Sequence, residues 1–347
     1  MNRFLQLRFL GLGMLLTVAI AACQRPANSP KATSEISSTS DSCQTVVHAL
    51  GETEICGQPQ RTIALGPYVL EPLVALDVQP IGFADHMAFG PETYDNPSEQ
   101  IPYIGERITN QPANVGVAFT PSIEAIAKAQ PDLIIGTEFN AQQYETLSKI
   151  APTLLLEYYD IEGSLRIIAK AVGRSDAAEQ LIAETEQKVI STREAFSDFA
   201  SANSKALLLF SNPPQLSISK DDQELCHILM KDLGFQLVSL PRAEGTDSAD
   251  TAIPISSEQL PNLNDADFVI VFGSNFEERE DARSYEESQL SGSRKAWEEN
   301  AIAQSLDASK AEKVYFIPAY LCLGLPGPIG TELYLEELQA QLLSDEL

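Results

Sequence analysis

Short apolar runs alternate with amphipathic segments along the whole chain. In the first half, these runs predict strands at Thr62–Leu65, Ile81–Phe83, Leu133–Gly136 and Leu154–Glu157. In the second half, they predict strands at Ala206–Phe210, Leu216–Ser219, Phe235–Leu240, Phe268–Phe272 and Val314–Pro318. Strands that alternate with helical patterns are typical of α/β domains with mainly parallel sheets. We therefore predict an α/β fold.

Two segments with the same pattern indicate two similar lobes. Pro121–Gly136 and Pro254–Gly273 each contain a helix that follows Pro and Ser, then Asp, then a buried strand that ends in Gly. The part from Cys43 onward has roughly 300 residues, which is more than one ordinary core accommodates. Each half is therefore predicted to form a Rossmann-like lobe, the first at 43–172 and the second at 203–347.

A long helical pattern separates the two halves, over 173–202. Ser175 is a plausible N-cap for it. Its apolar residues fall near one side at helical spacing, namely Ala178, Leu181, Ile182, Val189, Phe196 and Phe199. About 25 residues at 1.5 Å each make a helix of about 40 Å. One long helix that joins two lobes predicts a stiff hinge and a small opening motion.

The N-terminus has the pattern of an export signal. Arg3 and Arg8 precede the apolar run Phe9–Ala22, which ends in small residues. This order is typical of a secretory signal peptide over 1–22, whereas a transmembrane anchor needs about 20 apolar residues. Ile20-Ala21-Ala22-Cys23 resembles the bacterial lipobox, which implies that Cys23 is lipidated. The Ser-, Thr- and Pro-rich stretch 23–42 is then predicted to be a flexible tether.

Four further cysteines follow Cys23. An even number in an exported protein predicts disulfide bonds. Cys43 and Cys56 flank a segment that alternates like a short hairpin, so we expect them to pair. Cys226 and Cys322 would then form a long-range bridge, with free buried thiols as the alternative. None of these spacings suits a zinc site.

The formal net charge of −26 limits the kinds of partner that the protein can bind. Nucleic acid is excluded, because phosphate binding needs a positive surface. The acidity mainly describes a solvated surface. An anionic ligand would therefore need a locally placed arginine or lysine.

Catalytic and metal motifs are absent from the sequence. His48, His86 and His227 are the only histidines, and no two stand at the spacing of metal ligands. His86 is expected to be solvated or packed, with a lone residue of the cleft as the alternative. The chain has no phosphate-binding loop, no G-x-S-x-G elbow and no H-E-x-x-H. GLPGPIG lacks the G-x-G-x-x-G spacing of a dinucleotide site. We predict no enzyme activity, no cofactor and no directly bound metal.

Several motifs occur together in a characteristic order. They are HALGETEICGQPQRTIAL, LEPLVALDVQPIGFAD, IGERITNQPANVG with PSIEAIAKAQPDLIIG, and KVYFIPAYLCLGLPGPIG with TELYLEELQAQL. From about Thr45 to Leu343, the chain resembles the periplasmic binding proteins that serve ABC transporters for ferric siderophores, cobalamin and haem. The resemblance implies the class III fold, in which one long helix joins two lobes and the ligand binds between the lobes. Ligands of open α/β sheets lie at the carboxyl ends of the strands.

The IGER motif gives the first ligand-binding candidate. The resemblance to ferric hydroxamate receptors implies that Arg107 points into the cleft, although the insertion ITNQPANVGVAFT separates it from the following helix. A guanidinium group donates several planar hydrogen bonds to carboxylate or hydroxamate oxygens. The alternative is a surface arginine paired with Glu106 or Glu99.

Other ligand candidates follow predicted strands. Tyr68 and Tyr320 come after the first and last strands, and a tyrosine at the cleft suits a bulky organic chelate. Rim packing is the alternative role for both. Lys220 and Arg242 follow strands of the second half and would supply positive charge. The segment GTEFN lacks the arginine of the catecholate-binding branch, which argues against a catecholate ligand.

The resemblance also implies that one glutamate of each lobe meets arginines of the permease. Glu71 in YVLEPLVAL matches the position in the first lobe, and Glu224 is the candidate in the second. A carboxylate in a first helical turn also suits the helix dipole, which is the alternative role of Glu71.

Together these features predict a periplasmic or extracytoplasmic substrate-binding lipoprotein of an ABC importer. Its predicted ligand is a ferric siderophore of hydroxamate or citrate-hydroxamate type, already formed before binding. Cobalamin or haem is the alternative ligand. The alternative classes are a lipoprotein hydrolase and a structural or adhesion lipoprotein. The expected partners are an ABC permease and, through the lipid anchor, a membrane, with the chain as a monomer.

Overall fold

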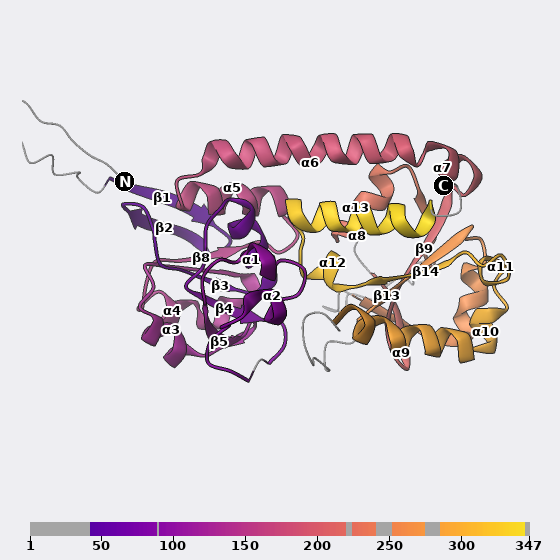
Figure 1. Cartoon of the computed structure of the whole chain (residues 1–347), viewed down its shortest axis with the longest axis horizontal. Coiled ribbons are helices and arrows are strands. Elements are labelled where there is room, and N and C mark those ends of the chain that lie inside the picture. Colours follow the sequence, from indigo (N-terminus) through magenta and orange to yellow (C-terminus); the bar gives the residue numbers. More distant parts are fainter. Residues whose placement is uncertain (1–41, 89, 220–223, 241–251, 275–284, 344–347) are drawn as a thin grey trace, which may run out of the picture. The chain divides into compact units, whose positions relative to one another are not determined.

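The computed structural model describes residues 42–88, 90–219, 224–240, 252–274 and 285–343 (Figure 1). The predicted signal peptide, Cys23 and nearly all of the tether lie outside these residues, as do Lys220 and Arg242. Within the described part, no helix has both the length and the apolar character needed to cross a membrane.

The N-terminal lobe is built on a six-stranded sheet with the order β6-β5-β4-β3-β7-β8. All neighbouring strands run parallel except β5 and β6. The strands are β3 (Thr62–Leu65), β4 (Gly82–Asp85), β5 (Ala113–Val117), β6 (Thr120–Pro121), β7 (Leu133–Thr137) and β8 (Thr153–Leu156).

The C-terminal lobe has a second six-stranded sheet, with the order β12-β10-β9-β13-β14 and β11 also paired to β9. β9 is parallel to β11 and β13, and β13 is parallel to β14, whereas β10 is antiparallel to both of its neighbours. The strands are β9 (Lys205–Asn212), β10 (Gln215–Ser219), β11 (Gln236–Leu237), β12 (Ala252–Ile255), β13 (Phe268–Gly273) and β14 (Val314–Pro318). The predicted α/β class with mainly parallel sheets is confirmed.

Helices cover these sheets and connect them. The helices of the N-terminal lobe are α1 (Pro67–Ala75), α2 (Pro97–Gln100), η1 (Gly105–Arg107), α3 (Ile123–Ala129), η2 (Glu138–Gln143), α4 (Tyr144–Leu147) and α5 (Ile161–Ala171). Two helices, α6 (Ser175–Ala195) and α7 (Ser197–Ala202), lead to the second sheet. The remaining helices are α8 (Leu225–Asp232), η3 (Ser257–Leu263), α9 (Tyr285–Glu299), α10 (Ala301–Gln304), α11 (Asp307–Lys310), α12 (Tyr320–Leu323) and α13 (Pro328–Leu342).

The nine predicted strands all fall on observed strands, but β6 and β12 were missed, and so was β5. Its sequence, ANVGV, lies in the segment that was interpreted as an insertion. Only Val115 is fully buried there, so the segment lacks the continuous apolar run of the other strands. This segment is thus part of the sheet.

Alternation along the strands divides the apolar side chains between two faces of each sheet. Ile63 and Ile134 contribute to a core on one face of the first sheet, and Leu207 and Val269 to a core on one face of the second. The opposite faces of both sheets share one continuous core, which also contains residues of α1, α6, α8 and α13. Because successive strand residues point to opposite faces, one strand serves two cores. The shared core joins the lobes, and the lobe boundaries at 172 and 203 stay predictions.

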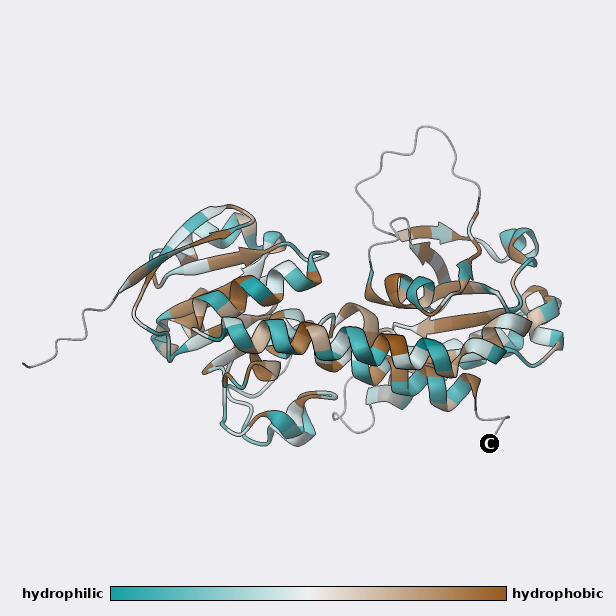
Figure 2. Cartoon of the chain, turned by 90° about the horizontal axis from the view of Figure 1, so that it is seen from above, coloured by the Kyte–Doolittle hydropathy of each residue, from teal (hydrophilic) through white to brown (hydrophobic). Residues whose placement is uncertain are grey.

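The helical connection is shorter than predicted. The long helix α6 ends at Ala195, and α7 begins after a break at Phe196. Phe196 is fully buried, with its ring 6.0 Å from that of Phe235. Helix α6 has 21 residues and is therefore about 31 Å long. Ser175 is its first helical residue and not its N-cap, which is Arg174. Hydrophilic and hydrophobic positions alternate along α6 in Figure 2, as expected for a helix packed on one side.

The two repeated segments have matching roles. Ser122 accepts a hydrogen bond from Ala125 N at the start of α3, and Ser256 forms a capping box at the start of η3. The aspartate of each repeat binds the start of the neighbouring strand. Asp132 accepts hydrogen bonds from Gln60 N and Arg61 N just before β3. In the same way, Asp267 accepts one from Lys205 N at the start of β9.

Both predicted disulfide bonds are present. Strands β1 (Cys43–His48) and β2 (Gly51–Cys56) form the expected hairpin, and Cys43 pairs with Cys56 across it. Cys226 on α8 is bonded to Cys322 on α12. In the described part of the chain, the one group of His, Cys, Asp and Glu side chains close enough to share a metal ion is Cys43, Glu54 and Cys56. Since its two cysteines are bonded to each other, this group offers no thiolate to a metal.

Candidate functional site

Aromatic side chains from both lobes meet at the carboxyl ends of the strands. Tyr68 follows β3, His86 follows β4, and Tyr320 follows β14. The His86 ring lies between the two tyrosines, with its centroid 5.4 Å from Tyr68 and 6.1 Å from Tyr320. Because parallel strands present their carboxyl ends at one edge of a sheet, this arrangement brings the ligand edges of both sheets together. Both predicted tyrosines therefore lie at the junction of the lobes.

Further rings extend this group on the side of the N-terminal lobe. Phe119, Phe139 and Tyr158 follow β5, β7 and β8. Tyr158 lies 5.1 Å from Tyr68 and 5.6 Å from Phe139, and Phe119 lies 5.5 Å from Phe139. The two phenylalanines are 39% and 47% exposed. Large exposed apolar side chains that gather at one place are typical of an interaction site.

Two rings surround Tyr320 on its other side. Tyr103 stacks against it at 5.6 Å, and Tyr285 of α9 meets it edge-on at 5.4 Å. We call the eight side chains the aromatic cluster: Tyr68, His86, Tyr103, Phe119, Phe139, Tyr158, Tyr285 and Tyr320. Offset and edge-to-face pairs of this kind stabilise a packed surface beyond the area that they bury.

The Leu323 carbonyl of α12 forms a polar link between the lobes. The Tyr158 hydroxyl donates a hydrogen bond to it, and so does the His86 ring. Burial lowers the pKa of His86, so its imidazole is neutral at pH 7. Burial likewise raises the pKa of Tyr68 and of Tyr158. These phenols stay protonated at neutral pH, so they donate hydrogen bonds and do not supply phenolate ligands to a metal.

Glu71 was predicted to contact a permease, but the structure buries it completely. Its Oε1 atom accepts a hydrogen bond from Ile329 N in the first turn of α13, at 2.7 Å. A Cβ atom at Gly327 would collide with the carboxylate, so a larger residue there would displace the Glu71 side chain. A buried carboxylate cannot reach an arginine of another protein. The helix-capping alternative describes Glu71 better, but the helix is α13 and not its own helix α1.

Glu224 is likewise unsuited to docking in this structure. It is 8% exposed at the N-cap of α8, and its Oε2 atom lies 3.1 Å from Nδ1 of His227. The His227 ring in turn stacks on Phe210 at 6.3 Å. Both predicted docking glutamates thus serve internal contacts.

Arg107 is exposed at the end of η1. It lines a hollow of about 260 Å³ together with Leu181 and Lys188 of α6 and Thr331 of α13, and no ring of the cluster lines this hollow. The structure therefore groups Arg107 with α6 and α13, and does not bring it together with Tyr68 and Tyr320.

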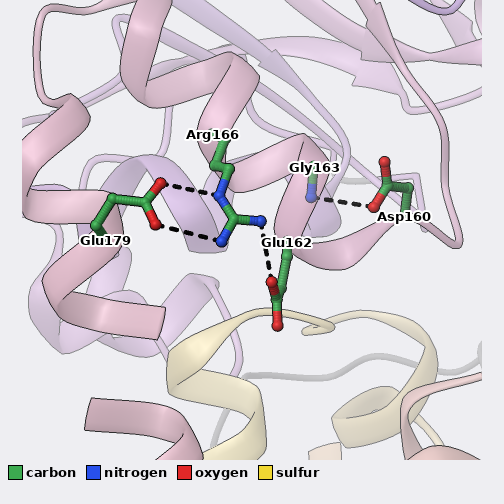
Figure 3. Close-up of polar contacts among 5 residues, drawn as sticks. All are labelled: Asp160, Glu162, Gly163, Arg166 and Glu179. Atoms are coloured by element: carbon green, nitrogen blue, oxygen red, sulfur yellow. Dashed lines mark hydrogen bonds and ion pairs between the residues drawn. The ribbon is translucent and has the colours of Figure 1, made fainter. Parts of the chain in front are cut away.

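A larger cavity of about 720 Å³ lies beside the junction, between α5, α6, α8 and α13. Arg166 lines this cavity, and Figure 3 shows its ion pairs with Glu162 and Glu179. Its Nε donates to Glu179 of α6 at 2.8 Å, and Nη1 donates to Glu162 at 2.9 Å. Asp160 caps α5 by accepting a hydrogen bond from Gly163 N. These groups hold α5 against α6, and as exposed ion pairs they add little stability each.

Sequence reasoning missed most of the aromatic cluster. His86, Phe119, Phe139 and Tyr158 each follow a strand of the first sheet, so the rule that selected Tyr68 also finds them. Phe119 was hidden because β5 was not recognised. Tyr103 and Tyr285 follow no strand, and no sequence pattern distinguishes them.

A family model described as periplasmic binding protein matches residues 63–321 of this chain. The chain belongs to the periplasmic binding protein family. It is therefore a solute-binding protein and not an enzyme, and it acts outside the cytoplasm.

Relatives of this periplasmic binding protein include two from Bacillus subtilis (strain 168). The putative ABC transporter substrate-binding lipoprotein YhfQ is 26% identical over 95% of both chains. The probable siderophore-binding lipoprotein YfiY is 26% identical over 75% of this chain and 76% of its own. The crystal structure of Staphylococcus aureus SirA complexed with staphyloferrin B aligns with a TM-score of 0.68. It is 24% identical and covers 87% of this chain and 98% of SirA, which confirms the class III fold.

Proposed function

We propose that this periplasmic binding protein captures a ferric siderophore between its lobes and delivers it to an ABC permease. The aromatic cluster carries the proposal, because it joins the carboxyl ends of both sheets. The names of the relatives point to the same class of ligand. The siderophore-binding relative YfiY shares most of its length with this chain.

Recognition requires no chemistry at the iron. The chelator supplies the iron ligands, so the protein contacts only the outer surface of the complex. Aromatic faces of Tyr68, Phe119 and Phe139 suit the organic part of a chelate. The protonated phenol of Tyr68 donates a hydrogen bond to a hydroxamate or carboxylate oxygen, whereas Tyr158 and His86 use their protons on the Leu323 carbonyl. Positive charge for an anionic chelate is assigned to Lys220 and Arg242, and an additional contact by Arg107 stays a prediction.

Delivery needs an exposed carboxylate on each lobe, and the repeated segments offer a matched pair. Glu124 lies in the first turn of α3 and Glu258 in the first turn of η3, and both are exposed. A hydrogen bond from its own backbone amide keeps the pKa of Glu258 below its usual range, so it is ionised at neutral pH. We assign permease docking to these two glutamates in place of Glu71 and Glu224. The proposal also includes a lipid anchor at Cys23 and a monomeric receptor.

Binding is tested on the purified full-length protein in mild detergent, by fluorescence of Trp297. This is the only tryptophan, and it lies on α9, the helix that carries Tyr285. The panel contains ferric schizokinen, ferrichrome, ferric citrate, ferric enterobactin, haem and cobalamin. Saturable binding of one hydroxamate or citrate complex supports the proposal. Binding of cobalamin or haem alone keeps the receptor role and replaces the ligand.

A pair of variants locates the site. Phe139→Ala removes an exposed ring of the aromatic cluster and is expected to weaken binding of the chelate about tenfold. Val47→Ala is the matched control, since Val47 is 66% exposed on the β1–β2 hairpin. If Phe139→Ala and Val47→Ala bind the chelate with equal affinity, the aromatic cluster is not part of the binding site.

A further inference from the structure

We infer that the Cys226–Cys322 disulfide positions the C-terminal lobe's share of the ligand site, by fastening α12 to α8. The part of this inference that concerns ligand affinity rests on the proposed function. The part that concerns the order of α12 does not.

Helix α12 is too short to hold itself in place. It has four residues, Tyr320–Leu323. A single helical turn is unstable alone, because the entropy lost in fixing its backbone exceeds the stabilisation from its few hydrogen bonds. Yet it supplies two contacts to the N-terminal lobe. Tyr320 packs against His86, and the Leu323 carbonyl accepts the hydrogen bond of Tyr158. The position of α12 therefore decides how the two halves of the cluster meet.

Separate groups hold the two ends of α12. At its start, the Gln289 side chain of α9 accepts a hydrogen bond from Tyr320 N at 3.3 Å. Near its end, Cys322 is bonded to Cys226 of α8, and both cysteines are almost completely buried. Leu323 is the next residue, so the covalent bond lies one residue from the carbonyl that meets Tyr158. Helix α8 is a firm support, because Leu229 and Met230 are buried in the shared core.

General stabilisation is the competing explanation of the bridge. Closing a loop of 96 residues restricts the unfolded chain and stabilises any fold, wherever the bridge lies. The chain contains its own control. Cys43–Cys56 closes the β1–β2 hairpin across a separation of 13 residues, and neither cysteine belongs to the aromatic cluster or to α12. Loss of either bridge lowers stability, but only loss of Cys226–Cys322 should disturb the ligand site.

The first measurement is ligand affinity, with the chelate that the wild-type full-length protein binds. C226A/C322A and C43A/C56A are compared at a temperature at which circular dichroism shows both to be folded. We expect C226A/C322A to lose affinity at least tenfold and C43A/C56A to keep it within twofold. Wild-type affinity in C226A/C322A, or an equal loss in both variants, would overturn the inference.

The second measurement needs no ligand. Hydrogen exchange followed by mass spectrometry reports on the α12 amides of Cys322, Leu323 and Gly324, which bond within the turn. We expect these amides to exchange at least tenfold faster in C226A/C322A and unchanged in C43A/C56A. Unchanged exchange in C226A/C322A overturns the inference, whatever the affinity.

The two measurements separate two kinds of failure. A wild-type protein that binds no chelate refutes the proposed function, and hydrogen exchange then decides the role of the bridge. If C226A/C322A does not fold, the bridge of the folded wild-type protein is reduced with a phosphine and the same two readouts are taken.

Discussion

Glu71 Oε1 accepts a hydrogen bond from Ile329 N at 2.7 Å, across 258 residues of sequence. Glu71 belongs to α1 of the N-terminal lobe, and Ile329 lies in the first turn of α13, which follows the second sheet. The amides of Gly327 and Gly330 also bond to the carboxylate. Exposed amides at a helix N-terminus favour a negative charge. One carboxylate thus fastens the last described helix to the first lobe.

Protonation of Glu71 makes stability depend on pH. Burial raises the pKa of this carboxyl from 4.5 to about 7, despite the opposing backbone hydrogen bonds and the Arg107 charge. Between these values the folded protein keeps a proton that the unfolded chain releases. The contribution of Glu71 to the free energy of unfolding therefore falls as the pH rises from 4.5 to 7, by on the order of 3 kcal/mol. Glu71→Gln should remove this part of the pH dependence.

The check is urea unfolding of the wild type and of Glu71→Gln at pH 5 and pH 7. Glu332→Gln, a change at a half-buried carboxylate of the same helix α13 that pairs with Lys188, is the control. If Glu71→Gln and the wild type show the same difference between the two pH values, the carboxyl does not titrate in this range.

Tyr158→Phe removes the hydroxyl that bonds to the Leu323 carbonyl and keeps the ring. The loss leaves a partly buried acceptor with one partner fewer, so the free energy of unfolding should fall by about 1 kcal/mol. Tyr144→Phe is the matched change at a hydroxyl beside His48 and Thr53, 3.4 Å from each. Its longer contacts predict a smaller effect. Denaturant unfolding of the two variants measures the difference, and a larger loss in Tyr144→Phe would contradict this ranking.

Asp132 and Asp267 should contribute differently to the free energy of unfolding, although they occupy equivalent positions of the repeat. Asp132 accepts two backbone amide hydrogen bonds and Asp267 accepts one. Since a hydrogen bond to a charged group contributes about 1.5–3 kcal/mol, Asp132→Ala should destabilise more than Asp267→Ala. Urea unfolding at pH 7 compares the two variants. An equal loss would mean that the second amide bond of Asp132 contributes nothing.

Charge reversal tests the assignment of the docking glutamates. Glu124→Lys and Glu258→Lys should each reduce import of the ferric chelate by tenfold or more in cells, because two like charges would then meet at the permease. Binding of the chelate by the purified variants should be unchanged. Glu52→Lys, an exposed change on the β1–β2 hairpin, should leave both properties intact. Normal import by Glu124→Lys and Glu258→Lys would mean that the permease binds another part of the chain.

The sequence predicts those parts of the fold that rest on local patterns. The apolar strands, the hairpin that pairs Cys43 with Cys56 and the start of the repeated segments can be read from neighbouring residues. The predictions fail where contacts with a distant segment determine the local structure. ANVGV becomes β5 because β4 offers it a partner, and Phe196 interrupts the long helix because Phe235 receives its ring.

The candidate site divides in the same way. Tyr68 and Tyr320 were found because each follows a strand, and the position after a strand is a local property. Glu71 was assigned to the surface, because its own helix gives no sign that α13 comes to cover it. The partner of a buried charge is set by the tertiary fold, and no spacing rule within α1 contains it.

The contact between Glu71 and α13 also has a consequence for the order in which the protein matures. A polypeptide is synthesised from its N-terminus, so the residues of α1 are made long before those of α13. Until α13 forms, the carboxyl group of Glu71 lacks the helix that supplies its hydrogen-bond donor. The contacts of the first lobe are therefore completed only after almost the whole chain has been synthesised.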